Sequence, residues 1–427
     1  MNIDVQGQAL TLLNRMAQAD WPDRLKLRKP LEELIYRGSR ASFKLAADRA
    51  LKGVGGPRPV EVDALFDLSL SDEQQMLVQM LQEFARDVLR PAALGADAQA
   101  AIPAAVLNQA QALGLTHYGV SEAQGGMAGD RTTVSNALIA EALAQGDLSL
   151  AAALLVPLSA ANCIRRWASA EQQARWLPAF VAEEEAPLIA IAVNEARPLF
   201  DPCQLSTKAS RRGRHYHLTG EKCLVLRGQE ASQLIVAAQT REGPALFLVE
   251  AGAKGVAREP EPAMGLKATA TARIDLKNVK VPADCRLAAE HFDYRAFLDH
   301  AGLAWCALAV GTGQAALDYA ITYCNERIAF GEPISHRQGV AFMVADMAVE
   351  LDAMRLLVWR ACARAEQGLP FQREAYLARL LCGEKAMKIG TDAVQLLGGH
   401  GFTQEHPVER WYRDLRAVTL MAGGLQL

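Results

Sequence analysis

The spacing of apolar residues changes twice along this chain, and few folds accommodate both changes. From about 66 to 185 the apolar side chains recur at a helical period, as at Met76, Met80 and Phe84. From about 187 to 287 the period is two, in short segments such as Leu234–Ala238, and from about 291 the helical period returns. Short strands at this spacing predict a small barrel or sandwich. The order predicts the α+β class, with a β domain between two helical ones.

The same changes divide the chain into expected domains. These are a helical N-terminal extension and linker (1–65), an N-terminal helical domain (66–185), a central β domain (186–290) and a C-terminal helical bundle (291–427). The extension ends in a Gly/Pro-rich linker at 53–59, and we expect its helices to pack against the body or against a partner.

Two segments of the sequence have the pattern of a helix start. Ser71 and Ser169 each precede an apolar periodic run, and a glutamine follows three residues later, at Gln74 and Gln172. A serine and a glutamine at this spacing satisfy each other's backbone N–H groups, which is the capping box. Both serines are therefore predicted to be helix N-caps.

Composition excludes several classes of function. The chain has 427 residues, 51% of them hydrophobic, with a net charge of −3, so nothing indicates binding to nucleic acid or to an anionic membrane. The longest uncharged run, Ala301–Leu317, contains glycines and is short for a membrane span, so it predicts a buried core helix.

The cysteines indicate a reducing compartment. All 8 are scattered without a Cys-x-x-Cys pair, which argues against a disulfide framework and against a zinc or other metal site. The start of the chain lacks the apolar core and cleavage site of a signal peptide. We therefore expect a cytoplasmic protein.

An arginine lies at the junction between two long apolar helical patterns. The segment Tyr323–Ile334 closes the first pattern, turns at Gly331 and leads to Gln338 at the start of the second. Arg327 and Gln338 at such a junction could bind an anionic cofactor group. They could equally cap and solvate a helix end.

The chain resembles the acyl-CoA dehydrogenase family from about residue 69 to 424. The resemblance is carried by segments that recur in family order: Leu70–Gln74, Val120–Gly126, Lys277–Pro282, Arg327–Ile334, Gln395–Phe402 and Arg410–Arg416. They are similar to the family's opening helix and to its "PEEYGG", "EDVRVP", "ERxxFGxPI", "QxxGGxGY" and "RxxRDAR" motifs.

The resemblance implies a fold and a chemistry. An N-terminal helical domain, a β-barrel domain and a C-terminal four-helix bundle would enclose FAD, usually in a tetramer built as a dimer of dimers. A carboxylate would take the α-proton of an acyl-CoA while the β-hydrogen leaves as hydride to the flavin. An electron-transfer flavoprotein would reoxidise the flavin.

The resemblance also assigns cofactor-binding residues. Arg327 matches the arginine that pairs with the pyrophosphate of FAD held by a neighbouring subunit, a role that suits a planar guanidinium. Phe330 and Gln338 match its partners against the adenosine half. Gln395 and Gly399 match a glycine turn that lets the backbone approach adenine and phosphates closely. That turn could also be an ordinary helix C-cap.

The flavin side of the expected site departs from the family pattern. Asn194 replaces a hydroxyl that would meet the flavin, Phe200 replaces a serine near the CoA moiety, and Leu224–Leu226 replaces the family's "WIT" strand. The apolar replacements cannot donate side-chain hydrogen bonds to a flavin, whereas Asn194 can.

The family's catalytic carboxylate is missing at both of its known positions. These positions are Ala422 and, in some branches, Ala301, and neither side chain accepts a proton. Losing general-base help lowers a rate by about 10²–10⁴. Asp299 and His300 are rotated from the face of Ala301 by about 200° and about 100° along a helix. Neither is a convincing base: His300 is the better candidate only if the start of the helix is distorted, and it could instead be a capping or exposed histidine.

Two smaller expectations concern the end of this sequence. The backbone N–H of Ala422 could still polarise a thioester carbonyl. The family's "TSEIQ" segment is reduced here to Gly424–Leu427, so a flavin contact and some packing are expected to be absent.

Three functional hypotheses follow. The first is an FAD-dependent acyl-CoA dehydrogenase with an unusual base. The second is a non-catalytic subunit that completes the FAD site of a catalytic partner in a mixed oligomer. The third is other flavin chemistry on the same fold, as in related oxidases and monooxygenases. The sequence does not select the acyl chain, its carrier or the oligomer.

Overall fold

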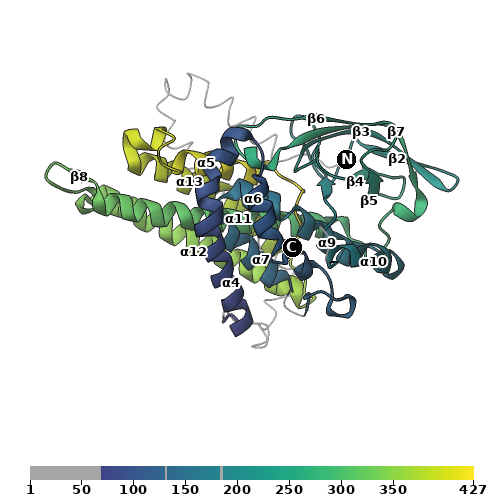
Figure 1. Cartoon of the computed structure of the whole chain (residues 1–427), viewed down its shortest axis with the longest axis horizontal. Coiled ribbons are helices and arrows are strands. Elements are labelled where there is room, and N and C mark those ends of the chain that lie inside the picture. Colours follow the sequence, from purple (N-terminus) through teal and green to yellow (C-terminus); the bar gives the residue numbers. More distant parts are fainter. Residues whose placement is uncertain (1–68, 130–131, 183–185) are drawn as a thin grey trace, which may run out of the picture. The chain divides into compact units, whose positions relative to one another are not determined.

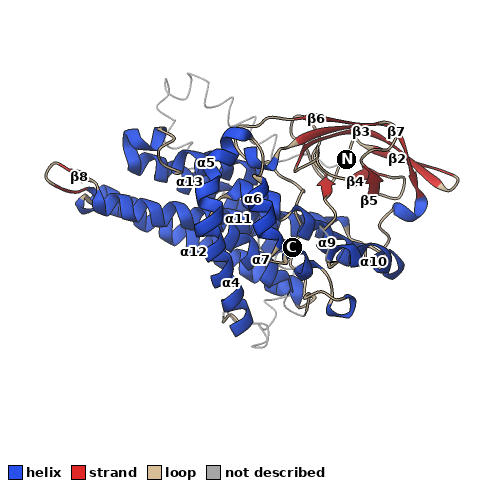
Figure 2. Cartoon of the chain, viewed as in Figure 1, coloured by secondary structure: helices blue, strands red, loops and turns tan. Residues whose placement is uncertain are grey.

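A computed structural model describes residues 69–129, 132–182 and 186–427, all of which belong to one compact unit, Leu68–Leu427. The expected helical extension at 1–65 lies outside the described residues. Within the described part, helices are followed by a β module and then by helices again (Figures 1 and 2). The change of hydrophobic period thus predicted the order of the elements.

The N-terminal part is helical. Its α-helices are α4 (Asp72–Phe84), α5 (Arg90–Gln99), α6 (Ala104–Gln111), α7 (Thr132–Ala144), α8 (Leu148–Leu154), α9 (Val156–Trp167) and α10 (Ala170–Trp176). Both predicted capping boxes are confirmed: Ser71 Oγ accepts from the Gln74 N–H and the Gln74 side chain accepts from the Ser71 N–H, and Ser169 and Gln172 repeat this arrangement. Gln172 also donates to the carbonyls of Asp284 and Arg286, so this cap ties α10 to the end of the β module.

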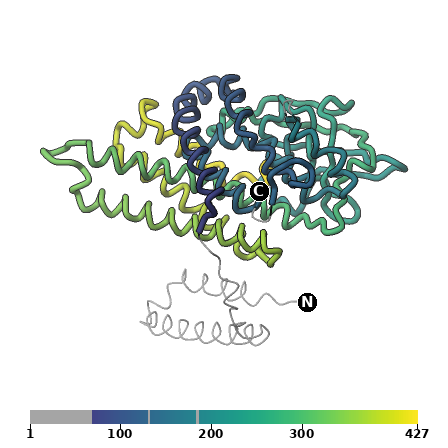
Figure 3. The backbone as a smooth tube through the Cα atoms, turned by 60° about the horizontal axis from the view of Figure 1, so that its bottom comes forward, coloured from purple at the N-terminus to yellow at the C-terminus, as the bar shows by residue number. Residues whose placement is uncertain are grey.

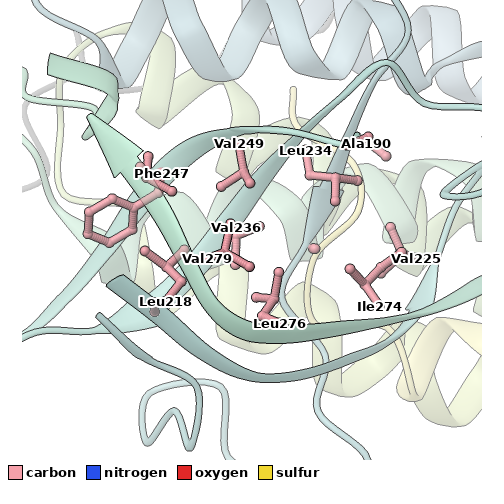
Figure 4. Close-up of a cluster of buried hydrophobic side chains, with 14 of the residues drawn as sticks. Ala190, Leu218, Val225, Leu234, Val236, Phe247, Val249, Ile274, Leu276 and Val279 are labelled. Atoms are coloured by element: carbon pink, nitrogen blue, oxygen red, sulfur yellow. The ribbon is translucent and has the colours of Figure 1, made fainter. Parts of the chain in front are cut away.

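The β module is one curved sheet of β1 (Ile189–Ala192), β2 (Lys208–Arg212), β3 (His215–Val225), β4 (Gln233–Gln239), β5 (Pro244–Glu250), β6 (Val256–Pro260) and β7 (Ala272–Pro282). The strand order is β1-β4-β2-β3-β7-β6, and β5 pairs with β4. β1 and β4 run parallel, whereas the β3–β7 pair at the other end is antiparallel. Figure 4 shows the core, in which Leu218, Val236 and Leu276 lie between the curved strands.

One strand is longer than its sequence suggests. Thr219-Gly220-Glu221 is typical of a turn between two strands, but β3 continues through it with a register shift against β7. A Cβ at Gly220 would lie 2.5 Å from Thr207 Oγ1. The glycine therefore permits a close approach of Thr207 to the strand and does not reverse the chain.

The C-terminal part contains α11 (Tyr294–Glu326), α12 (Gln338–Glu366), α13 (Gln372–Leu397) and the short α14 (Val408–Leu415). The hairpin β8 (Ile328–Ala329) and β9 (Glu332–Pro333) joins α11 to α12. The expected core helix is confirmed, since nearly every residue of α11 from Ala296 to Leu317 is buried. Among the described residues no single helix is long and apolar enough to cross a membrane, and only α8 and α9, bent by 47°, reach that length and composition together.

Candidate functional site

A cavity of about 610 Å³ lies where the β module meets the C-terminal helices. It is lined by the loop from Asn194 to Cys203, by Leu224, by the first turns of α11, by Tyr376 and Arg379 of α13, and by Thr419, Leu420 and Ala422. We call it the junction cavity. It brings the altered flavin-side residues and one of the two expected base positions to the same place.

The two alanines at the expected base positions lie in different surroundings. Ala422 lines the junction cavity, whereas Ala301 is fully buried in α11 and is not one of the lining residues. The cavity wall therefore presents a methyl group at the place where the family resemblance predicts a carboxylate.

Asn194 holds the segment that carries Ala422. Its side-chain Nδ2 donates to the Leu420 carbonyl at 2.8 Å, and its Oδ1 accepts the Ala422 N–H at 3.0 Å. Sequence analysis offers Asn194 as a flavin donor and the Ala422 N–H as a donor to a thioester. In the structure Asn194 Oδ1 accepts the Ala422 N–H, so that N–H is not free for a thioester without rearrangement. The Asn194 amide donates one N–H to Leu420 and has a second N–H to offer.

A buried ion pair holds the loop that follows Asn194. Lys222 Nζ, fully buried, donates to Glu195 Oε1 at 2.9 Å and to the Val193 carbonyl at 3.0 Å. Burial lowers the pKa of Lys222 to about 8. Burial acts to raise the pKa of Glu195, but Lys222 and the backbone N–H groups of Ser206 and Thr207 outweigh it and lower that pKa. The pair fixes one wall of the junction cavity.

Asp299, and not His300, lines the junction cavity. Its Oδ1 lies 3.6 Å from Arg295 Nε, and its Oδ2 is buried without a hydrogen-bond partner in the described part of the chain. Burial raises the pKa of Asp299 to about 6, against the opposing charges of Arg295 and Arg379. An incompletely satisfied carboxylate in a cavity is a candidate acid or base.

His300 lies inside the helical core. Only 2% of the residue is exposed, and its ring packs against Phe371 and Trp167 at centroid distances of 5.0 and 6.4 Å. Burial and the nearby Arg166 and Arg165 lower its pKa well below the usual value. This environment does not match the capping or exposed histidine considered from sequence, and it gives His300 no access to the junction cavity.

The orientation of α11 explains why Asp299 is the residue on the cavity wall. Arg295, Leu298 and Asp299 all line the cavity, and Gly302 continues the same face. A Cβ at Gly302 would lie 3.4 Å from the Arg379 side chain, whose Nη2 donates to the Met421 carbonyl at 2.7 Å. Reasoning from the face of Ala301 favoured His300, which the structure places in the core and not in the cavity wall. The spacing of Arg295, Asp299 and Gly302 marks the face of α11 that lies toward the cavity.

The segment that the resemblance places against the flavin, Leu224–Leu226, is apolar. Leu224 lines the junction cavity, Leu226 is buried, and the Leu224 N–H already donates to Glu261 Oε2 at 2.6 Å. Phe200 also lines the cavity, under the guanidinium of Arg197 at 5.4 Å from its ring centroid.

A second cavity, of about 350 Å³, lies at the far end of α11, and we call it the hairpin cavity. Arg327, Gln395 and Gly399 line it together with Tyr323 and His400. No carboxylate of the described residues pairs with the Arg327 guanidinium, and a Cβ at Gly399 would meet nothing within 4 Å. An open backbone turn beside an unpaired guanidinium fits an anionic group such as a phosphate.

Two predicted cofactor residues lie outside the hairpin cavity. Phe330 is 96% exposed at the tip of the β8–β9 hairpin, and Gln338 is exposed at the start of α12. Neither lines the hairpin cavity. The structure of one chain thus gathers Arg327, Gln395 and Gly399 but leaves Phe330 and Gln338 facing away from the body.

The two cavities are far apart within one chain. Asp299 and Arg327 are 28 positions apart on α11 and its C-cap, which corresponds to about 42 Å at 1.5 Å per residue. Figures 1 and 3 both show the hairpin at the end of the molecule opposite the β module. One dinucleotide cannot contact Arg327 and the junction cavity of the same chain.

Comparison with known proteins agrees with this architecture. Profiles of the N-terminal, middle and C-terminal domains of acyl-CoA dehydrogenases match residues 71–184, 190–279 and 294–426. The mitochondrial short-chain specific acyl-CoA dehydrogenase of Bos taurus is 31% identical over 83% of this chain and 88% of its own length.

Solved structures give the same result. The butyryl-CoA dehydrogenase of Megasphaera elsdenii superposes with a TM-score of 0.76 at 30% identity, covering 84% of this chain and 96% of that one. PigA, solved with FAD and proline, has a TM-score of 0.76 at 27% identity with the same coverage. The chain therefore belongs to the acyl-CoA dehydrogenase family.

Proposed function

We propose that this protein is an acyl-CoA dehydrogenase-type flavoprotein that binds an acyl thioester in its junction cavity and supplies Arg327 to FAD held by a neighbouring copy. The observation that carries the proposal is the separation of about 42 Å along α11 between the junction cavity and the guanidinium of Arg327, which pairs with no carboxylate of the described residues. In this proposal the pyrophosphate-binding residues and the junction cavity lie at opposite ends of α11, so two copies would be needed to form one site.

The hairpin cavity supports the cofactor half of the proposal. Arg327 would pair with the pyrophosphate, and the backbone at Gln395 and Gly399 would approach the adenosine half. FAD, when bound, supplies the acceptor for a hydride. Phe330, almost fully exposed in the single chain, would be covered by the neighbouring copy, and this agrees with the role that the family resemblance assigns to it.

The junction cavity supports the substrate half. Its volume of about 610 Å³ is within the usual range for small-molecule sites. Leu298, Leu224 and Phe200 give it apolar walls for an acyl chain, and Arg295 and Arg379 add positive charge. The methyl group of Ala422 leaves more room than a glutamate would.

An exposed apolar stripe supports assembly into an oligomer. Phe342, Val349 and Leu356 recur every seven residues along α12 and are exposed by 59%, 69% and 49%. Exposed large apolar side chains on one helix face indicate a protein interface. A cytoplasmic location and reoxidation by an electron-transfer flavoprotein remain predictions that accompany this proposal.

The visible spectrum of the purified protein tests the proposal directly. We expect protein expressed with ample riboflavin to be yellow and to release FAD on denaturation. Anaerobic addition of straight-chain acyl-CoA esters should bleach the flavin band. Colourless protein with no released flavin contradicts the proposal.

A second candidate function is favoured by a specific observation. Asn194 occupies the Ala422 N–H, and alanine replaces the carboxylate at 422, so the junction cavity has lost groups that the family uses in turnover. The chain would then be a non-catalytic subunit that lends Arg327 to a catalytic family member. Co-expression with such a member separates the candidates: a mixed oligomer in which only the partner retains flavin supports this one, and flavin bleaching by the homo-oligomer excludes it.

A further inference from the structure

One carboxylate in the junction cavity has no structural partner that accounts for its burial. Asp299 is 9% exposed, and its Oδ2 is buried without a hydrogen bond in the described part of the chain. Its ion pair with Arg295 is long, at 3.6 Å. A purely structural buried carboxylate is normally satisfied by close donors, as Glu195 is by Lys222 and two backbone N–H groups.

The surroundings of Asp299 place it near the missing base. Asp299 and Ala422 line the same cavity, and Arg379 connects their two walls, because its side chain packs on Gly302 of α11 and donates to the Met421 carbonyl. A group bound against the Ala422 wall is therefore in the same cavity as the Asp299 carboxylate.

We propose that Asp299 is the base that takes the α-proton of an acyl thioester bound in the junction cavity, in place of the carboxylate missing at position 422. The inference rests on the proposed function, because it needs a thioester in that cavity. In the step, the α-carbon–hydrogen bond breaks and an O–H bond forms on Asp299. The electron pair of the broken bond remains on the substrate as the thioester enolate. The reverse step returns the proton.

The chemistry of the cavity suits this role. Burial raises the pKa of Asp299 to about 6, so at neutral pH it is mostly ionised yet more basic than an ordinary aspartate. Arg379 and Arg295 provide positive charge that offsets the enolate. The charged groups that act on Asp299 are Arg295 and Asp293 from its own end of α11 and Arg379 from α13.

Exchange of the α-proton tests the proposal without depending on flavin reduction. Butyryl-CoA would be incubated anaerobically with the purified protein in D₂O, and deuterium at the α-carbon followed by mass spectrometry. We expect Asp299→Asn to slow exchange by about 10²–10⁴ while butyryl-CoA still binds, as measured by calorimetry. Exchange by the unmodified protein should increase with pH through a midpoint near 6.

Asp284→Asn is the matched control. Asp284 lines neither cavity, and its exposed carboxylate pairs with Arg175 at 3.3 Å at the end of the β module. We expect that variant to exchange at the unmodified rate. Adding Ala422→Glu to Asp299→Asn should restore exchange, because it returns a carboxylate to the opposite wall.

The outcomes separate the two levels of inference. If the Asp299→Asn variant binds butyryl-CoA and exchanges its α-proton as fast as the unmodified protein does, the role of Asp299 is overturned. The proposed function is then left intact. Protein that binds no butyryl-CoA overturns the proposed function. Loss of exchange in both Asp299→Asn and Asp284→Asn overturns the specific assignment, because it indicates a general disturbance of the protein.

Discussion

At the scale of single residues, Asp299 has a consequence for stability that is independent of catalysis. Its pKa is raised to about 6 in the folded protein, above its ordinary value of 3.8, chiefly by burial. The folded state therefore binds this proton more tightly than the unfolded state does. Stability associated with Asp299 is complete below about pH 4 and is lost as the pH rises through 6.

We therefore predict that Asp299→Asn stabilises the protein at pH 7. The change removes a buried charge and keeps the shape of the side chain. A pKa shift of about two units corresponds to at most about 3 kcal/mol, and loss of the Arg295 contact reduces the gain to about 1–3 kcal/mol. Urea unfolding at pH 7 and pH 4 measures the difference in free energy of unfolding between the variant and the unmodified protein. The difference should nearly vanish at pH 4. Equal destabilisation at both pH values would show that the carboxylate is structural.

At the scale of elements, the β8–β9 hairpin has features of a contact with another molecule. Phe330 adopts a φ of +57° at its tip and is almost fully exposed. A bulky residue with positive φ is uncommon, and such strain clusters at ligand and interface sites. Arg327, the C-cap of α11, lies at the base of the same hairpin.

We predict that Arg327→Gln lowers flavin retention without affecting the fold. Loss of a bidentate guanidinium–phosphate contact should weaken FAD binding by about 10-fold or more. Arg337→Gln is the control, because Arg337 lies on the same hairpin connection but pairs with Glu332 at 3.0 Å. Flavin absorbance per chain after gel filtration, with circular dichroism to verify the fold, measures both variants. Equal loss in the two would assign the effect to the hairpin as a whole.

The segment after Ala422 is closely packed. It keeps only part of the family's "TSEIQ" segment, yet Gly423–Leu427 is buried. Trp305 Nε1 donates to the Gly423 carbonyl at 2.8 Å, Gln426 Nε2 donates to the Phe297 carbonyl at 2.9 Å, and Asn162 Nδ2 donates to the Gln426 carbonyl at 3.2 Å. The segment holds the 422 wall of the junction cavity against α9 and α11.

We predict that Gly423→Ala destabilises the protein strongly. A Cβ at this position would lie 2.4 Å from Val193 Cγ2, and the backbone there is fixed by the Trp305 hydrogen bond. Overpacking of this kind costs about 1–3 kcal/mol. Gly339→Ala in α12 is the control, since its Cβ would meet nothing within 4 Å, and we expect it to be neutral or slightly stabilising. Thermal unfolding of both variants measures the difference, and equal melting temperatures would contradict the prediction.

These elements show which features local sequence determines. The capping boxes at Ser71 and Ser169 and the buried run of α11 follow from short-range spacing, which is visible in one sequence. The Asn194–Ala422 contact joins residues 228 positions apart, so no local pattern contains it. The choice between Asp299 and His300 depends on how α11 is rotated against α13 and the β module, and its apolar residues surround it too uniformly to fix that rotation.

At the scale of the whole molecule, α11 is the element that separates the two cavities. It has 33 residues, about 50 Å, with the junction cavity at its first turns and Arg327 at its C-cap. The apolar stripe on α12, formed by Phe342, Val349 and Leu356, lies on the helix that returns from the hairpin. An isologous pair of chains would place the Arg327 end of one beside the junction cavity of the other, so each site would draw residues from both chains.

This arrangement predicts complementation between two defective chains. Arg327→Gln damages the site of the neighbouring copy, whereas Asp299→Asn damages the chain's own junction cavity. In a mixed dimer, one site receives Arg327 from the Asp299→Asn chain and Asp299 from the Arg327→Gln chain, so that site is intact. The other site carries both substitutions.

Co-expression of the two variants with different affinity tags tests this arrangement. With random pairing, half of the dimers are mixed and half of their sites are intact, so anaerobic bleaching of the flavin by butyryl-CoA, which needs both FAD and the base, should recover to about a quarter of the unmodified rate. Mixed dimers isolated through both tags should reach about half of the unmodified rate. Each variant expressed alone should show little bleaching of the flavin by butyryl-CoA. Asp299→Asn paired with itself through both tags controls for the tags. If Arg327 and Asp299 served the same site within one chain, no mixture would recover, because every site would carry one substitution.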